Sequence, residues 1–249
     1  MKYGKYSQHI NFMIKAVKIG EKIVNQNKFL RVIDKGEFDI VTNVDLEIEQ
    51  AIIRDLGKIF PDIPIISEES CNGALASTCF VIDPVDGTKN FYHGTPIWGI
   101  QMAYIENGEP VASVLYCPEI NLQVVAGAGI GAYSNGKKMY YEPKNLDHSM
   151  VCIDGPQCHR WNLSAFLDNQ IQAIRILGST CVGFAMVVSG QIDGYIYMCD
   201  HPWDLLPGLG ACKNAGLYVY DNNKSMAIVA NSARLLEFMK ASVLEQLKK

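Results

Sequence analysis

The chain has 249 residues, which suffices for one large domain or for two small ones. A hydrophobic content of 49% with 19% charged residues is ordinary for a globular protein. The formal net charge of −4 at pH 7 argues against a nucleic-acid polymer as a partner, because proteins that bind one normally present a basic face. No apolar run approaches the length of a membrane-spanning helix, and the start of the chain does not read as a signal peptide. We therefore expect no membrane partner and a cytoplasmic location.

The cysteine pattern fits a reducing compartment. None of the eight cysteines forms a C-x-x-C pair, which argues against a zinc ribbon and against a thioredoxin-like motif. We predict that these cysteines are free thiols in the cytosol.

Two helices and a run of strands are predicted for the first half of the chain. Apolar residues at helical spacing predict a helix from Ser7 to Asn25, and residues 28–35 are typical of a loop or a weak hairpin. A second helix follows, with Thr42 or Asn43 as its cap and Pro61 at its end. Short strands are then expected at 63–66, 80–82, 98–105, 111–116, 122–126 and 131–134, and from residue 98 onward they form an antiparallel meander turning at Asn107-Gly108.

A polar, irregular stretch at 144–149 marks a boundary between two lobes of one catalytic unit. We expect an N-terminal α+β lobe at residues 1–146 and a C-terminal α/β lobe at residues 147–249. In the second lobe Asp204 is predicted to cap a helix over 205–214, with Pro207 tolerated in its first turn. Strands are predicted at 151–154, 173–177, 192–198, 217–220 and 226–229, and further helices at 162–168, at 180–188 and from Ser232 onward.

Two of the predicted strands run directly into acidic residues. The strand at 80–82 leads into Asp83-Pro84-Val85-Asp86-Gly87-Thr88, and the strand at 63–66 leads into Ser67-Glu68-Glu69. If the two strands are parallel neighbours, Glu68 and Asp83 converge, and carboxylates in one pocket repel one another unless a cation lies among them. Clustered oxygen ligands suit Mg²⁺, especially beside a substrate phosphate. The alternative is an Asp-rich turn that only ends a strand.

Two further motifs have an ordinary structural alternative. Asp45 lies in the first turn of the second predicted helix, where a carboxylate either caps the helix or serves a site. The sequence Gly178-Ser179-Thr180 separates a predicted strand from an apolar helix. This pattern is typical of an anion site at a helix N-terminus and also of an ordinary capped helix.

Four stretches, taken in order, resemble the inositol monophosphatase family. Asp39–Asp45 is similar to the family motif D-x-V-T-x-x-D, Ser67–Ser70 to E-E-S, Asp83–Phe91 to D-P-[ILV]-D-G-T-x-N-F, and Trp203-Asp204 to W-D. The resemblance implies a layered α/β/α/β/α sandwich of the inositol monophosphatase / fructose-1,6-bisphosphatase type, assembled as a homodimer. It also implies Mg²⁺-dependent hydrolysis of a small phosphomonoester by a metal-activated water.

The resemblance further implies a role for individual residues. Glu68, Asp83 and the Val85 carbonyl would hold one Mg²⁺, and Asp83, Asp86 and Asp204 would hold a second, with a third ion near Glu68 in some members. The catalytic residues would be Glu68 and Thr88, which position and deprotonate the water, with Asp45 orienting Thr88. The phosphate and substrate contacts would be Asp86, Gly87, Thr88, Gly178, Ser179, Thr180, Tyr197 and Asp204, and Lys35 would help to neutralise the site.

Two positions depart from the family pattern and leave the substrate open. Leu206-Pro207 stands two residues after the W-D motif, where the family commonly has small residues. Tyr197 stands where inositol phosphatases tend to place a glutamate, and it offers one hydroxyl and an apolar ring instead of an anionic acceptor. The substrate could be an inositol monophosphate, a sugar phosphate or a polyol phosphate. The alternatives are fructose-1,6-bisphosphate, 3′-phosphoadenosine 5′-phosphate, histidinol phosphate, NADP, or a non-catalytic regulatory protein that binds metal or phosphate.

Overall fold

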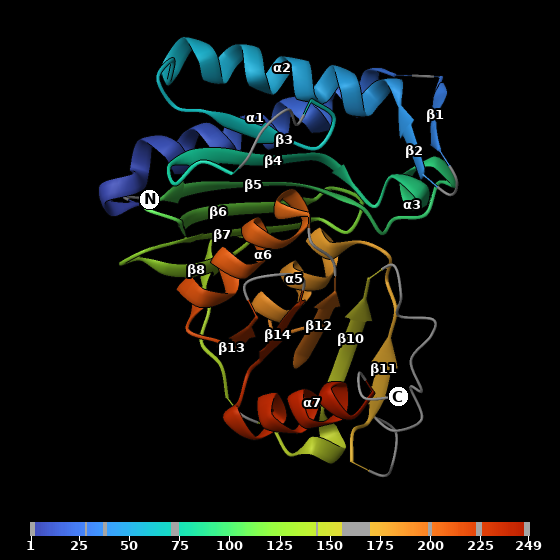
Figure 1. Cartoon of the computed structure of the whole chain (residues 1–249), viewed down its shortest axis with the longest axis vertical. Coiled ribbons are helices and arrows are strands. Elements are labelled where there is room, and N and C mark those ends of the chain that lie inside the picture. The colour runs from blue at the N-terminus through green and yellow to red at the C-terminus, as the bar shows by residue number, and fades with distance from the viewer. Residues whose placement is uncertain are drawn as a thin grey trace.

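The computed structural model describes residues 3–27, 29–36, 39–70, 75–142, 144–155, 170–198, 201–222 and 226–246. Its helices and sheets alternate in five layers (Figure 1). Helices α1 (Ser7–Gln26) and α2 (Asn43–Ile59) cover one face of a seven-stranded sheet. Helices α5 (Thr180–Val188) and α6 (Pro202–Ala215) lie between that sheet and a five-stranded one, and α7 (Ala233–Gln246) covers the far side. The expected α/β/α/β/α sandwich is confirmed.

The seven-stranded sheet contains the predicted meander. Its spatial order is β3-β4-β5-β6-β7-β8-β9, and every neighbouring pair is antiparallel except β3 and β4, which are parallel. Asn107 and Gly108 adopt positive φ angles of 55° and 82°, as a tight hairpin turn between twisted strands requires. The strands are β3 (Ile65–Ser67), β4 (Cys79–Asp86), β5 (Gly99–Glu106), β6 (Glu109–Cys117), β7 (Leu122–Gly127), β8 (Gly131–Ser134) and β9 (Lys137–Lys138).

The five-stranded sheet has the order β11-β10-β12-β14-β13. Strand β10 runs parallel to β11 and β12, whereas β14 is antiparallel to β12 and β13. The helix predicted at 162–168 lies outside the described residues. The predicted lobe boundary falls in the short helix η2 (Leu146–His148), where the chain passes from one sheet to the other, and the division into lobes stays a prediction. The strands are β10 (Met150–Asp154), β11 (Ala173–Arg175), β12 (Gly194–Met198), β13 (Tyr218–Asp221) and β14 (Met226–Ala230).

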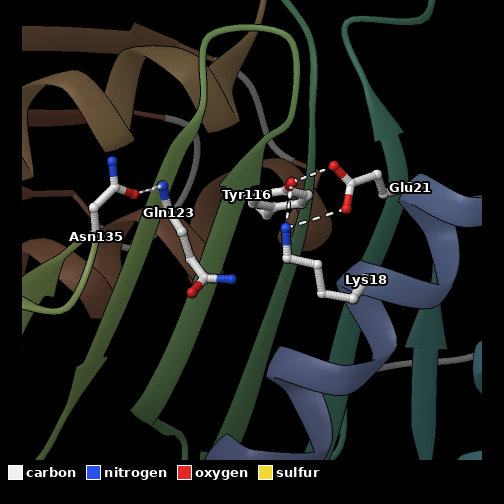
Figure 2. Close-up of polar contacts among 5 residues, drawn as sticks. All are labelled: Lys18, Glu21, Tyr116, Gln123 and Asn135. Carbon is white, nitrogen blue, oxygen red and sulfur yellow. Dashed lines mark hydrogen bonds and ion pairs between the residues drawn. The ribbon is translucent and has the colours of Figure 1, made fainter.

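Polar contacts of the buried Tyr116 with two more exposed side chains of α1 join that helix to the large sheet (Figure 2). The hydroxyl of Tyr116 on β6 donates to Glu21 Oε1 at 2.6 Å, and Lys18 Nζ contacts the same hydroxyl and lies 3.1 Å from Glu21 Oε2. Further along the sheet, Asn135 Oδ1 accepts from the backbone N–H of Gln123 at 2.8 Å, at the open end of the β7–β8 hairpin. None of the described helices combines the length and the hydropathy needed to span a membrane.

Helix α6 differs from the prediction in two respects. It begins at Pro202, so His201 takes the cap position and Asp204 lies inside the first turn; the prediction that Asp204 caps the helix is wrong. Proline suits the first position because its φ is already helical and its missing N–H costs nothing there. Pro207 consequently falls in the helix interior and not in the first turn, where it removes one backbone hydrogen bond.

Candidate active site

The two parallel strands β3 and β4 bring their acidic ends to the same edge of the sheet. The Glu68 N–H still donates to the Ile82 carbonyl at 3.3 Å, which places Glu68 immediately beside Asp83 along the strands. The sequence predicted that Glu68 and Asp83 converge if these strands are parallel neighbours. The strands are parallel neighbours in the structure.

A β-bulge sets the direction of the two aspartates on β4. Asp83 pairs with Gln101 of β5 and Asp86 pairs with Gly99, so three steps along β4 match two along β5. In a regular strand, residues three apart point to opposite faces. The extra residue in the bulge turns both aspartates to the same side. Pro84 is compatible with this irregular place because it has no N–H to contribute to the ladder.

Three carboxylates meet at this point of the structure. Oxygen atoms of Asp83, Asp86 and Asp204 all lie within 4.8 Å of one another. Asp83 is fully buried, and its burial, followed by the negative charges of Glu68, Asp86 and Asp204, raises the pKa of its carboxyl well above the usual range. Such a cluster is relieved either by a proton or by a cation, and an all-oxygen set of ligands fits a hard divalent cation such as Mg²⁺.

Asp86 is held by the N-terminus of α5. Thr180 Oγ1 and the Cys181 N–H each donate to its carboxylate at 2.8 Å, and the Ser179 hydroxyl makes a third contact. Ser179 is also the cap of α5, since its Oγ accepts from the Val182 N–H. The anion that this helix end holds in the structure is thus a carboxylate of the protein. Direct contact of Gly178, Ser179 and Thr180 with a substrate stays a prediction.

Asp204 reaches the cluster from the first turn of α6. The Tyr197 hydroxyl donates to its Oδ2 at 2.7 Å, and its backbone carbonyl lies 3.2 Å from Thr180 Oγ1. Tyr197 is only 2% exposed, so the ring expected to face a substrate is buried and its hydroxyl reaches a carboxylate of the cluster.

Asp45 caps α2 and also contacts a second residue of the predicted site. Its Oδ2 accepts from the N–H and the hydroxyl of Thr42, which forms a capping box at the start of α2. Its Oδ1 lies 3.2 Å from the hydroxyl oxygen of Thr88, which is also 3.0 Å from the Val85 carbonyl. Burial raises the pKa of Asp45, and its hydrogen bonds oppose that rise. Asp45 therefore caps a helix and contacts Thr88 at once.

At Gly87 the turn after β4 packs closely against the residues that precede α5. Its φ of +84° favours glycine, and a Cβ there would lie 3.0 Å from Ser179 Cβ and 3.1 Å from the Ile97 carbonyl. Gly87 precedes the short helix α3 (Thr88–Tyr92), so the backbone N–H groups expected to bind phosphate lie at its start. Lys35 lies in β1 (Val32–Gly36), which pairs with β2 (Asp39–Thr42), and its side chain lies outside the described residues.

Three polar residues at the site were not predicted from the sequence. Gln101, fully buried on β5, donates from Nε2 to Thr180 Oγ1 at 2.9 Å and lies 3.4 Å from Asp83 Oδ2. Asn90 donates to the Ile97 and Leu177 carbonyls at 2.8 Å. Asp154, at the end of β10, accepts from the N–H of Leu177 at 2.9 Å and of Gly178 at 2.7 Å. A lone amide in the apolar strand 99–105 was the available signal for Gln101.

Comparison with known proteins identifies relatives of this chain. The family model described as "Inositol monophosphatase family" matches residues 5–246. A Thermotoga maritima protein named fructose-1,6-bisphosphatase/inositol-1-monophosphatase is 34% identical over 187 residues, covering 75% of this chain and 73% of its own. The Nus factor SuhB of Xylella fastidiosa is 31% identical over 223 residues, covering 85% of this chain and 81% of its own. A solved structure of an IMPase from Thermotoga maritima is 28% identical, with a TM-score of 0.85 over 96% of this chain and 99% of its own.

The layered sandwich and these relatives define the protein as a phosphatase, a hydrolase of phosphoric monoesters. The chain belongs to the inositol monophosphatase family, whose members act on small phosphorylated substrates.

Proposed function

We propose that this chain is a Mg²⁺-dependent phosphomonoesterase that hydrolyses a small phosphorylated metabolite such as an inositol, sugar or polyol monophosphate. The observation that supports this most strongly is the convergence of Asp83, Asp86 and Asp204 within 4.8 Å, with Glu68 close enough to raise the pKa of Asp83. So many negative charges at one buried point favour a divalent cation as the natural counter-charge.

Two overlapping sets of oxygens would hold the metal. Glu68, Asp83 and the Val85 carbonyl would form one set, and Asp83, Asp86 and Asp204 the other, with Asp83 shared. The Val85 carbonyl has two lone pairs, so its contact with Thr88 leaves one for a cation. When bound, Mg²⁺ neutralises charge on the phosphate oxygens and lowers the pKa of a nearby water.

Thr88 and Asp45 would orient the attacking water. Thr88 has a single hydroxyl hydrogen, which is directed to Asp45 Oδ1 or the Val85 carbonyl, so the lone pairs of its oxygen remain to accept a hydrogen bond from water. Asp45 is in turn held by Thr42, which fixes the acceptor that Thr88 needs. Glu68 would accept the proton of the water as general base.

The backbone at Gly87 and Thr88 would bind the phosphate. The αL conformation of Gly87 brings the chain close to the cluster, and N–H groups at the start of a helix favour an anion. Lys35 is proposed as a further positive charge at this site. The same proposal includes a homodimer in the cytoplasm; the five described cysteines, all unpaired and buried, support a reducing compartment.

A substrate panel with and without Mg²⁺ tests the proposal. Phosphate release would be measured from inositol 1-phosphate, several sugar and polyol monophosphates, histidinol phosphate, 3′-phosphoadenosine 5′-phosphate and NADP, with EDTA-treated protein as the control. We expect release from at least one monophosphate, lost in EDTA and restored by Mg²⁺. Folded, Mg²⁺-supplied protein that releases phosphate from none of them would overturn the proposal and favour a non-catalytic binding protein.

Fructose-1,6-bisphosphate is the second candidate substrate. Two relatives, at 34% and 30% identity, carry the double name fructose-1,6-bisphosphatase/inositol-1-monophosphatase. Including this bisphosphate in the panel separates the candidates through the ratio of kcat/KM for the bisphosphate to that for the best monophosphate.

A further inference from the structure

Tyr197 occupies a position from which only its hydroxyl reaches the carboxylate cluster. The residue lies on β12, and its ring packs against Phe184 at 6.1 Å and Tyr195 at 6.3 Å between ring centroids. The side chain is 2% exposed. A ring enclosed in this way has little freedom to turn toward a substrate. Its hydroxyl therefore stays where the structure places it, 2.7 Å from Asp204 Oδ2.

Asp204 is the member of the cluster that comes from a different part of the chain. Asp83 and Asp86 share β4, where the bulge and the sheet fix their backbone, whereas Asp204 lies in the first turn of α6. Asp86 receives hydrogen bonds from α5, and Asp83 receives one from the Val85 N–H at 3.1 Å. The Tyr197 hydroxyl supplies Asp204 with a corresponding donor from the second sheet.

We propose that Tyr197 is a positioning residue for Asp204 and belongs to the support of the metal centre instead of the surface that recognises substrate hydroxyls. This inference rests on the proposed function, in which Asp204 binds the metal. By holding Oδ2, the hydroxyl orients the carboxylate while lone pairs remain for a cation, because an ionised carboxylate has about four acceptor positions. Partners of this kind fix the direction of a metal ligand, and their removal typically lowers metal affinity or activity about 10- to 100-fold.

Tyr197→Phe tests this role because it removes the hydroxyl and keeps the ring. We expect the affinity for Mg²⁺, measured by calorimetry without substrate, and for Mn²⁺, measured by electron paramagnetic resonance, to fall about 10- to 100-fold. At saturating Mg²⁺ the KM for the best monophosphate should change less than about twofold, since the hydroxyl does not contact the substrate.

Tyr116→Phe is a matched control. It also removes a buried tyrosine hydroxyl that donates to a carboxylate, Glu21, at 2.6 Å, but it does so at the packing of α1 on the sheet (Figure 2). Its metal affinity should equal that of the wild type. A second control combines Tyr197→Phe with Asp204→Ala: if Tyr197 acts through Asp204, removing the hydroxyl costs no further metal affinity once Asp204 is gone.

Three outcomes would overturn the inference. One is wild-type metal affinity in Tyr197→Phe together with a raised KM, which would place the hydroxyl on the substrate. Another is a loss of affinity equal to that of Tyr116→Phe, and the third is a loss that persists undiminished in the Asp204→Ala background. Metal binding is measured without turnover, so these outcomes are independent of the substrate panel, and a wild type that fails the panel while binding metal would reject only the proposed function.

Discussion

At the scale of the residue, the site depends on carboxylates that are costly to bury together. Asp83 is the extreme case, because it has no exposed surface and faces the charges of Glu68, Asp86 and Asp204. Folding without a cation places these charges against one another, and a bound cation converts that repulsion into attraction. The residues that contact the carboxylates, such as Thr180, Gln101 and Tyr197, are uncharged donors that orient them without adding charge.

Asp83→Asn should separate activity from folding. The amide keeps the size of the side chain but removes the charge that two metal sites are proposed to share. We expect kcat to fall by more than about 100-fold, beyond the loss typical of a residue that supports a metal ligand. Because the change also removes like-charge repulsion, the midpoint of thermal unfolding in EDTA should stay equal or rise. Near-normal kcat in this variant would contradict the metal assignment.

At the scale of the element, the N-cap residue of α5 also contacts a carboxylate of the site. Ser179 accepts from the Val182 N–H at 3.3 Å, as an N-cap does, and its hydroxyl also contacts Asp86. Ser232 accepts from the Leu235 N–H at 3.3 Å and directly precedes α7, the helix on the outer face of the five-stranded sheet (Figure 1). The two serines are equivalent as caps and different as contacts of the site.

Ser179→Ala and Ser232→Ala should therefore diverge in activity. Each should lower the free energy of unfolding by about 1 kcal/mol, the usual cost of losing a serine cap. Only Ser179→Ala should also weaken metal binding and lower kcat/KM. Urea unfolding and phosphate release measure the two effects, and an equal change of activity in both variants would show that Ser179 serves only as a cap.

The packing of α1 gives the stability a dependence on pH. His9 on α1 stacks between Tyr104 and Phe60, with ring centroids 4.0 Å and 4.9 Å away, and burial lowers its pKa from the usual 6.5. Glu106 raises this pKa and Lys5 lowers it. The folded state thus disfavours the protonated imidazole. The contribution of the neutral His9 to the free energy of unfolding is therefore fully present above the unfolded pKa of about 6.5. It is lost as the pH falls below that value.

His9→Phe should remove this part of the pH dependence. Phenylalanine preserves the stacking and does not titrate. We expect the free energy of unfolding of the wild type, relative to that of His9→Phe, to be constant above about pH 7.5 and to decline between about pH 6.5 and pH 5. Urea titrations of both proteins across this range measure the difference, and two curves that stay parallel would contradict the prediction.

At the scale of the whole molecule, the site exists only where separate layers meet. Asp83 and Asp86 come from the large sheet, and Asp204 comes from the helical layer beneath it. The turn at Leu177 and Gly178 is held by Asp154 from the five-stranded sheet and by Asn90 from α3. The proposed cation would therefore bind the folded chain and not the unfolded one.

Mg²⁺ should accordingly stabilise the whole protein. A ligand that binds only the folded state adds about 2.7 kcal/mol at 100 times its Kd. We expect the thermal midpoint to rise with Mg²⁺ concentration in the wild type and to rise much less in Asp83→Asn. Differential scanning calorimetry in EDTA and at several Mg²⁺ concentrations measures this, and equal shifts in both proteins would place the bound ion elsewhere.

The sequence by itself determined most of the helices and strands, and it predicted that two strands end in acidic residues. Helical spacing, the Thr42 cap and the Asn107-Gly108 turn act over a few residues, so α1, α2 and the meander could be predicted. The acidic strand ends could also be recognised, because each lies within a few residues of its strand. The five layers were predicted from the family motifs, since local periodicity does not reveal them.

Only the tertiary structure decided which partner each polar group has. The start of α6 at Pro202, the contact of Ser179 with Asp86 and the burial of Tyr197 against Asp204 join residues that are distant in the chain or lie on different elements. Gln101 and Asp154 were missed for this reason, since a single polar residue at a strand position shows its meaning only when the opposite element is in place. Packing sets these distances, and packing is a property of the assembled layers.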